Sequence, residues 1–119
     1  MRPEGTMDLQ ARRVADRKLA ERRQEARRDF VRYAEQAADA DREYRIRKAS
    51  VYAEERSQGN TSVGAELEAN AQAADARHRR DIAESLAKAA LLRIQEVERE
   101  TISVRDIHST SERIDGLAA

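Results

Sequence analysis

The chain has no cysteine and no tryptophan, and only one proline, four glycines and four aromatic residues stand among its 119 residues. Without cysteine there is no disulfide framework, no thiol nucleophile and no cysteine-based zinc site. The longest uninterrupted apolar run, Ala89–Leu92, is too short for a membrane span or the core of a signal peptide. These absences favour a soluble cytoplasmic protein without a membrane segment.

The sequence also lacks the motifs that carry common chemistry. It contains no glycine-rich phosphate loop and no nucleophile elbow, and the hydroxyl-rich run at 109–111 has no base placed beside it. Asp75, His78 and Asp81 have the spacing of metal ligands on one helix, but the second Glu-x-x-His motif of a di-metal site is missing. We therefore predict no enzyme activity, no cofactor and no metal site.

Charged residues make up 39% of the chain, and 23 Lys and Arg balance 23 Asp and Glu. Alanine is abundant and large aliphatic residues are sparse, so helix propensity is high while the material for a globular core is thin. Balanced charge with spaced apolar residues favours helices that fold when packed, rather than disorder. We therefore predict an all-α chain that does not form a compact monomeric domain.

Two long helix-forming segments flank one short break, residues 58–61. Gly59 in this break stands where a helix end needs a left-handed residue. Thr61 or Ser62 can cap the second helix, and Gly64 weakens its start. Helices of matched length joined by a tight turn predict a long antiparallel helical hairpin, coiled-coil-like in its packing. The predicted segments are a flexible N-terminus at 1–6, a helix at 7–57, a turn at 58–61, a second helix at 62–115 with a possible break near 64–71, and a flexible C-terminus at 116–119.

In the second half of the first segment, residues at alternating steps of three and four define one stripe of a helix. This stripe consists of Phe30, Tyr33, Ala37, Ala40, Tyr44, Arg47 and Val51. In the first half the pattern fades, because Asp16 and Arg23 fall on the stripe while Leu9, Val14 and Leu19 lie off a common line. We expect that half to be either a solvent-exposed helix or a helix completed only by another chain.

The second segment carries a broader stripe. It consists of Ala83, Leu86, Ala90, Ile94, Val97, Thr101, Val104, Ile107, Ser111 and Ile114. Ile82, Ala89 and Leu92 widen it beyond what one partner helix covers. Two such helices alone bury too little apolar surface to offset the cost of ordering the chain, so we predict self-association into a helical bundle, a dimer or larger. The predicted oligomer seam is Phe30, Tyr33, Ala37, Tyr44, Val51, Leu86, Ala90, Ile94, Val97, Val104 and Ile107.

Charge is unevenly distributed along the chain. Residues 1–32 carry ten Lys or Arg against six Asp or Glu, and residues 61–119 carry eight against eleven. The basic residues near the start recur every five positions, which carries them around a helix instead of along one face. Interleaved acids favour a solvated helix with surface ion pairs, and contact with nucleic acid or a partner is the alternative. These candidate contact residues are Arg12, Arg13, Arg17, Lys18, Arg22, Arg23, Arg27 and Arg28.

Three stretches of the second half resemble a known class of proteins. They are NTSVGAELEA at 60–69, DARHRRDIAESLAKAA at 75–90 and IQEVERE at 94–100. This class consists of small helical proteins encoded by tailed bacteriophages and prophages, often near replication and recombination genes. The resemblance covers residues 44–107 and leaves the basic start of the first helix outside. It implies a viral accessory protein without catalytic motifs, and it carries over no established activity.

Three functions are open from the sequence, and all of them act by binding in the host cytoplasm. The first is a phage accessory protein that binds a protein partner, a host or defence factor. The second is a nucleic-acid-binding factor in replication or recombination, with the basic N-terminal half as its surface. The third is an oligomer that sequesters a small nucleotide ligand between its helices.

Overall fold

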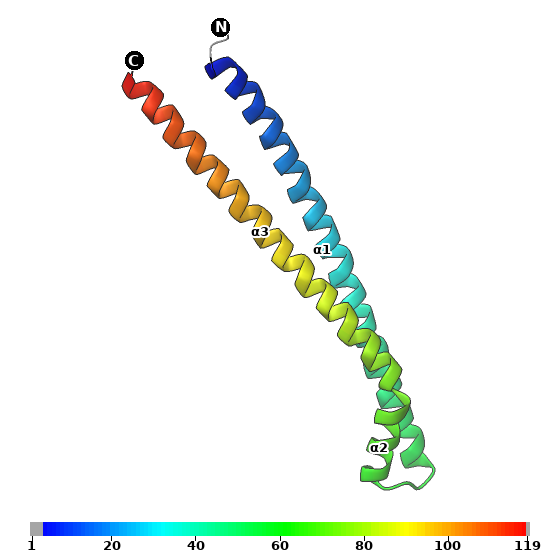
Figure 1. Cartoon of the computed structure of the whole chain (residues 1–119). Coiled ribbons are helices and arrows are strands. Elements are labelled where there is room, and N and C mark those ends of the chain that lie inside the picture. Colours follow the sequence, from blue (N-terminus) through cyan, green and yellow to red (C-terminus); the bar gives the residue numbers. More distant parts are fainter. Residues whose placement is uncertain (1–3, 119) are drawn as a thin grey trace. The chain divides into compact units, whose positions relative to one another are not determined.

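The computed structural model describes the backbone of residues 4–118 and the side chains of residues 8–103, 105–107, 110 and 114. Every element in this part of the chain is an α-helix. Helix α1 spans Glu4–Ser57, α2 spans Ser62–Gln72 and α3 spans Ala74–Ala118 (Figure 1). The predicted all-α helical hairpin is therefore confirmed.

Both ends of the hairpin contain more helix than the sequence indicates. Helix α1 begins at Glu4 and includes Gly5, within the 1–6 segment that the sequence predicted to be flexible. Helix α3 passes through Gly116 to Ala118, where flexible chain was expected. A glycine in a helix costs about 1 kcal/mol relative to alanine, which neighbouring helix formers can tolerate. Residues 1–3 and 119, also predicted to be flexible, lie outside the described residues.

Gly59 ends α1 in a left-handed conformation, with a φ of 91°. Its N–H donates to the carbonyl of Arg56 at 3.1 Å, and the N–H of Asn60 donates to the carbonyl of Glu55 at 3.0 Å. This pair of bonds is the Schellman motif, which satisfies carbonyls that the helix end leaves open. The prediction of a left-handed glycine at this position is confirmed.

Thr61 caps the start of α2. Its side-chain oxygen accepts a hydrogen bond from the Gly64 N–H at 3.1 Å, so Thr61 and not Ser62 is the cap. A Cβ atom on Gly64 would collide with Oδ1 of Asn60, whose amide Nδ2 donates to Glu55 Oε2 at 3.1 Å. The Asn60 side chain thus fills the space that Gly64 leaves open.

The second half of the hairpin consists of two helices that meet at Ala73. The Ala73 N–H donates to the carbonyl of Ala69 and the Arg77 N–H to the carbonyl of Ala73, both at 2.9 Å, so hydrogen bonding continues across the junction. The break predicted near 64–71 therefore lies slightly later in the chain. Neither proline nor glycine marks it in the sequence.

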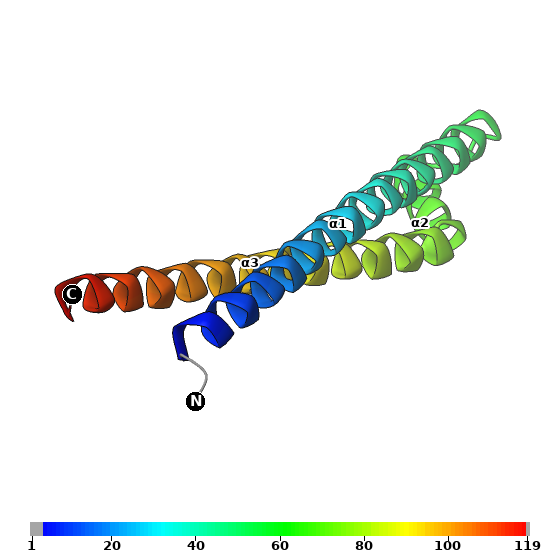
Figure 2. The same cartoon turned by 90° about the horizontal axis from the view of Figure 1, so that it is seen from above.

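The chain divides into two compact units. The central unit is Phe30–Ala89, and the terminal unit contains the described residues up to Asp29 and from Ala90 onward. In the central unit α2 lies beside the end of α1 in both views (Figures 1 and 2). The two helices are linked by an ion pair between Lys48 and Glu66 at 3.9 Å and by a hydrogen bond from Arg47 to Gln72 at 3.2 Å.

Candidate interaction surfaces

The core of the central unit combines large side chains of α1 with alanines of α2 and α3. On α1, Phe30, Tyr33, Ala37 and Tyr44 are half-buried and Val51 is buried. The inward-facing alanines of the other two helices are Ala65, Ala69, Ala73, Ala76, Ala83 and Ala87. Small residues on one helix and large ones on the other allow close packing. These α1 positions of the predicted seam therefore form a packing face within the chain itself.

The predicted stripe on α3 is displaced by one residue at Leu86. Ala87 is half-buried, whereas Leu86 is 43% exposed. The inward residues step from Ala83 to Ala87 to Ala90, so Leu86 lies at the edge of the packed face. The steps 83–86–90 and 83–87–90 both fit a helical stripe, so the sequence pattern alone does not choose between Leu86 and Ala87.

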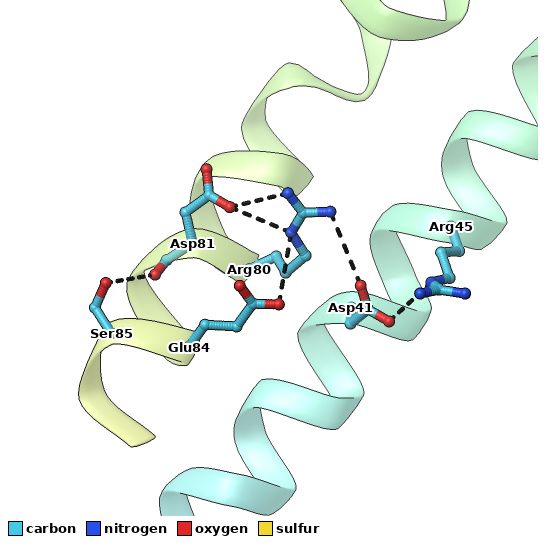
Figure 3. Close-up of polar contacts among 6 residues, drawn as sticks. All are labelled: Asp41, Arg45, Arg80, Asp81, Glu84 and Ser85. Carbon is cyan, nitrogen blue, oxygen red and sulfur yellow. Dashed lines mark hydrogen bonds and ion pairs between the residues drawn. The ribbon is translucent and has the colours of Figure 1, made fainter. Parts of the chain in front are cut away.

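Arg80 lies on the inward stripe of α3, between Ala76 and Ala83, and projects toward α1 (Figure 3). Its side chain is 22% exposed and its guanidinium lies 3.9 Å from the carboxylate of Asp41 on α1. The same guanidinium stacks over the ring of Tyr44, with its central carbon 4.5 Å from the ring centroid. Arg80 therefore connects α3 to α1 through both a charge and an aromatic face.

Carboxylates of α3 hold the Arg80 guanidinium in place. Nε and Nη2 of Arg80 both donate to Oδ1 of Asp81, at 3.2 and 3.0 Å, and Glu84 lies 3.9 Å away. The hydrogen bond with Asp81, together with the nearby negative charges, raises the pKa of Arg80 above its usual value. Arg80 thus stays charged, and this cluster is a link between helices. The stripe predicted from the sequence began at Ala83, one step after Arg80, so this cluster was not expected.

The core of the terminal unit joins the first part of α1 to the last part of α3. Leu19 and Ala26 are buried on α1, and Ala90 and Val97 are buried on α3. Thr101 is also buried, and its hydroxyl donates to the carbonyl of Val97 at 2.9 Å. The expectation that this half of α1 is solvent-exposed or completed only by another chain is therefore wrong, because α3 of the same chain packs against it.

Three further residues of the predicted seam on α3 lie in the terminal unit. Ile94 is half-buried, whereas Ile107 is exposed. Inward residues continue from Ile94 through Val97 to Thr101. The side chain of Val104 lies outside the described residues.

Three ion pairs connect the two helices of the terminal unit. Arg22 lies 2.9 Å from Glu100, Arg27 lies 3.5 Å from Glu98, and Arg93 lies 3.6 Å from Asp29. The basic start of the chain therefore meets its acidic end within one molecule. Each pair is largely exposed, so each contributes about 1 kcal/mol or less and serves mainly to fix register.

The remaining basic candidates do not form one surface. Arg12 and Arg23 are half-buried, and Nε of Arg23 is buried without a hydrogen-bond partner in the described part of the chain. The exposed candidates other than Arg22 and Arg27 are Arg13, Arg17, Lys18 and Arg28. These four form no ion pair with any residue that the structure describes. They are the basic groups that are available to a partner.

Large apolar side chains are mostly outside. Among residues whose side chains are described, only Leu19, Val51 and Val97 are buried large aliphatics. The exposed large hydrophobic residues are Leu9, Val14, Val31, Ile46, Tyr52, Val63, Leu67, Ile82, Leu86, Leu91, Leu92, Ile102, Ile107 and Ile114. Scattered apolar residues on a surface are normal, but here alanines lie inside while leucine and isoleucine side chains lie in contact with water.

Two hollows of the terminal unit are poorly suited to a nucleotide. One, of about 290 Å³, is lined by Arg22 and Glu100 with three smaller or apolar residues. The other, of about 420 Å³, has Asp106 as the only charged residue of its described lining. A phosphate needs unpaired donors and positive charge, and here Arg22 is already paired with a carboxylate.

The described residues include no group of three or more His, Cys, Asp or Glu that could hold a metal ion. None of their helices has a stretch long and apolar enough to cross a membrane.

Comparison with known proteins gives no relative: no family model matches, and neither a curated protein nor a solved structure matches the chain. The resemblance to small phage proteins therefore stays a prediction. The function has to be argued from the surfaces of the molecule.

Proposed function

We propose that this protein is a non-catalytic helical module that self-associates into a bundle and acts by binding a protein partner. One observation carries the proposal. On α3 of the central unit, alanines Ala83 and Ala87 face inward while Ile82 and Leu86 remain almost half exposed. Apolar burial contributes about 25 cal/mol per Å², so covering these side chains by a second copy stabilises the folded chain.

The arrangement within one chain supports the same conclusion. A two-helix core made largely of alanine removes little apolar surface from water, while ordering each residue costs about 1 to 2 kcal/mol. Additional helices from a second copy increase burial without adding new loops. The bundle then presents the remaining charged and apolar faces to a partner of different sequence.

The biological setting is also part of the proposal. The resemblance of residues 60–69, 75–90 and 94–100 to small phage proteins supports an accessory role in an infected cell, with a host or defence protein as the partner. The cytoplasm is the compartment in which such a partner would be met.

Light scattering coupled to gel filtration tests the assembly. We expect a dimer or larger species at micromolar concentration, and Leu86→Glu should shift the distribution toward the monomer. Gln95→Glu adds the same charge at an exposed polar position of α3 and is the matched control. A well-folded wild-type monomer at these concentrations would rule out self-association.

Affinity capture from infected host lysate tests the partner. Capture by the wild type that survives nuclease treatment supports a protein partner, whereas loss after nuclease treatment indicates nucleic acid. The nucleic-acid alternative has one favourable observation, the exposed Arg13, Arg17, Lys18 and Arg28. If several of them contact phosphates, log affinity for DNA must fall steeply and linearly with log salt concentration.

A further inference from the structure

Helix α2 of the central unit presents its largest apolar side chains to solvent. Val63 is 71% exposed and Leu67 is 66% exposed, while Ala65 and Ala69 are fully buried. Val63 and Leu67 are four residues apart, so they lie on the same face of the helix. We call this surface the α2 face. An amphipathic helix normally buries such residues, and here the small ones occupy the inside.

Acidic residues surround the α2 face. Between residues 54 and 75 the chain has five acids, Glu54, Glu55, Glu66, Glu68 and Asp75, against one base, Arg56. Glu66 and Glu68 flank Leu67 in the sequence, and α2 itself contains no Lys or Arg. The side chain of Glu66 is 61% exposed, and only a long contact of 3.9 Å links it to Lys48. A matching surface therefore needs an apolar residue among positive charges.

The terminal unit carries a surface with these properties. Val14 of α1 is 48% exposed. Arg13 precedes it, and Arg17 and Lys18 follow at three and four residues, which makes them its neighbours on the helix. All three basic side chains are exposed and form no ion pair within the described residues. We call this surface the Val14 face.

We propose that the α2 face of one copy binds the Val14 face of a second copy. The two faces differ, so the contact is head-to-tail and leaves one free α2 face and one free Val14 face at the ends of each complex. Growth is open-ended unless the rotation from copy to copy closes a ring. The paired surfaces are small and charged, so association is weak, depends on concentration and weakens as salt screens the charges. This contact goes beyond the bundle proposed above, which uses Ile82 and Leu86 of α3.

Sedimentation velocity of the full chain at increasing concentration tests the head-to-tail contact. In low salt the mean mass of the wild type should keep rising with concentration. Leu67→Glu and Val14→Glu should each raise the concentration at which growth begins by about tenfold or more, which corresponds to about 1.4 kcal/mol. Ile46→Glu, which adds a charge at another exposed apolar position of α1, should leave growth unchanged.

A mixture of the two variants gives the sharpest result. Leu67→Glu keeps an intact Val14 face and Val14→Glu keeps an intact α2 face, so an equimolar mixture should form complexes larger than either variant forms alone. Circular dichroism checks that both variants stay helical. The proposal is overturned if the wild type shows no growth, if Leu67→Glu grows normally, or if the mixture is no larger than its components.

Charge-reversal variants distinguish the head-to-tail contact from the bundle contact. Replacing Glu66 and Glu68 with lysine should abolish growth, and adding Arg13→Glu and Arg17→Glu should restore it. Leu86→Glu should reduce the size of the smallest species without preventing growth. A variant that stops growing but keeps the size of its smallest species has lost the head-to-tail contact. A variant that keeps growing from a smaller species has lost the bundle contact.

Discussion

At the residue scale, the turn between α1 and α2 depends on polar contacts where other Schellman motifs use an apolar one. The side chains of the two residues that usually make the apolar contact, Asn60 and Glu55, are here joined by a hydrogen bond at 3.1 Å. Because Asn60 also occupies the space beside Gly64, the end of α1 and the start of α2 are coupled through one side chain.

This coupling makes Gly64→Ala an unusual helix substitution. Alanine normally stabilises a helix by about 1 kcal/mol relative to glycine, but here its Cβ displaces Asn60 and breaks a hydrogen bond worth about 1 kcal/mol. We expect almost no net change in the free energy of unfolding. In an Asn60→Ala background, where Thr61 Oγ1 still lies 3.1 Å from the new Cβ, the same substitution should stabilise by at most about 1 kcal/mol. A urea-denaturation double-mutant cycle measures the difference, and additive effects would contradict the coupling.

Arg80 is the residue whose role was least visible in the sequence. Arg80→Met keeps an apolar stem but leaves Asp41, Asp81 and Glu84 without their shared cation. We expect it to lower the urea midpoint more than Arg79→Met, a matched change at an exposed neighbour. Adding Glu84→Gln should recover part of the loss, because it removes one of the opposed charges, whereas Asp41 keeps its ion pair with Arg45 at 2.8 Å. Equal effects of the two methionine variants would show that the cluster does not stabilise the fold.

The raised pKa of Arg80 defines how this contribution depends on pH. A cation whose pKa is higher in the folded state than in the unfolded state stabilises the fold fully below the unfolded pKa, which for arginine lies far above neutrality. The contribution disappears only as the pH rises through the folded value. Protonation of Arg80 therefore introduces no pH dependence near neutrality.

At the scale of the elements, the two halves of α1 differed in how well the sequence predicted them. The second half has aromatic residues such as Phe30 and Tyr33 on its inward stripe, so spacing alone locates the packed face. In the first half Arg23 occupies the stripe between Leu19 and Ala26, and a charged residue interrupts the apolar pattern. The pairing with α3 depends on contacts distant in the sequence, such as Arg22 with Glu100, which local patterns do not reveal.

Leu19→Ala measures how strongly the terminal unit is packed. Leu19 is 5% exposed, so its truncation should destabilise the unit by about 2 kcal/mol or more through lost burial and the cavity left behind. Leu92→Ala, at a position that is 60% exposed on α3, should change stability by about 0.5 kcal/mol or less unless a second copy covers it. Hydrogen exchange of α1 amides before Asp29 provides a local readout. Similar exchange in both variants would contradict the packing of α1 on α3.

At the scale of the whole molecule, the sequence predicted the helical hairpin because one strong break, centred on Gly59, separates two long helix-forming segments. It located the turn but not the junction at Ala73, since no residue there disfavours a helix. On α3 it predicted a stripe broader than one partner helix covers, and Leu86 and Ile107 of that stripe are exposed in the single chain. Ala87, beside Leu86, lies inward, a choice that three-four spacing alone does not make.

The exposed aliphatic side chains lead to a thermodynamic prediction for the whole molecule. If a second copy covers Leu86 and its neighbours, folding is coupled to association, and the melting midpoint must rise with protein concentration. Circular dichroism melts over a wide concentration range measure this dependence. Leu86→Glu should lower the midpoint and flatten its concentration dependence, because a buried charge opposes association, whereas Gln95→Glu should preserve the wild-type slope. A cooperative wild-type melt with a constant midpoint would mean that the alanine-rich core suffices for one chain alone.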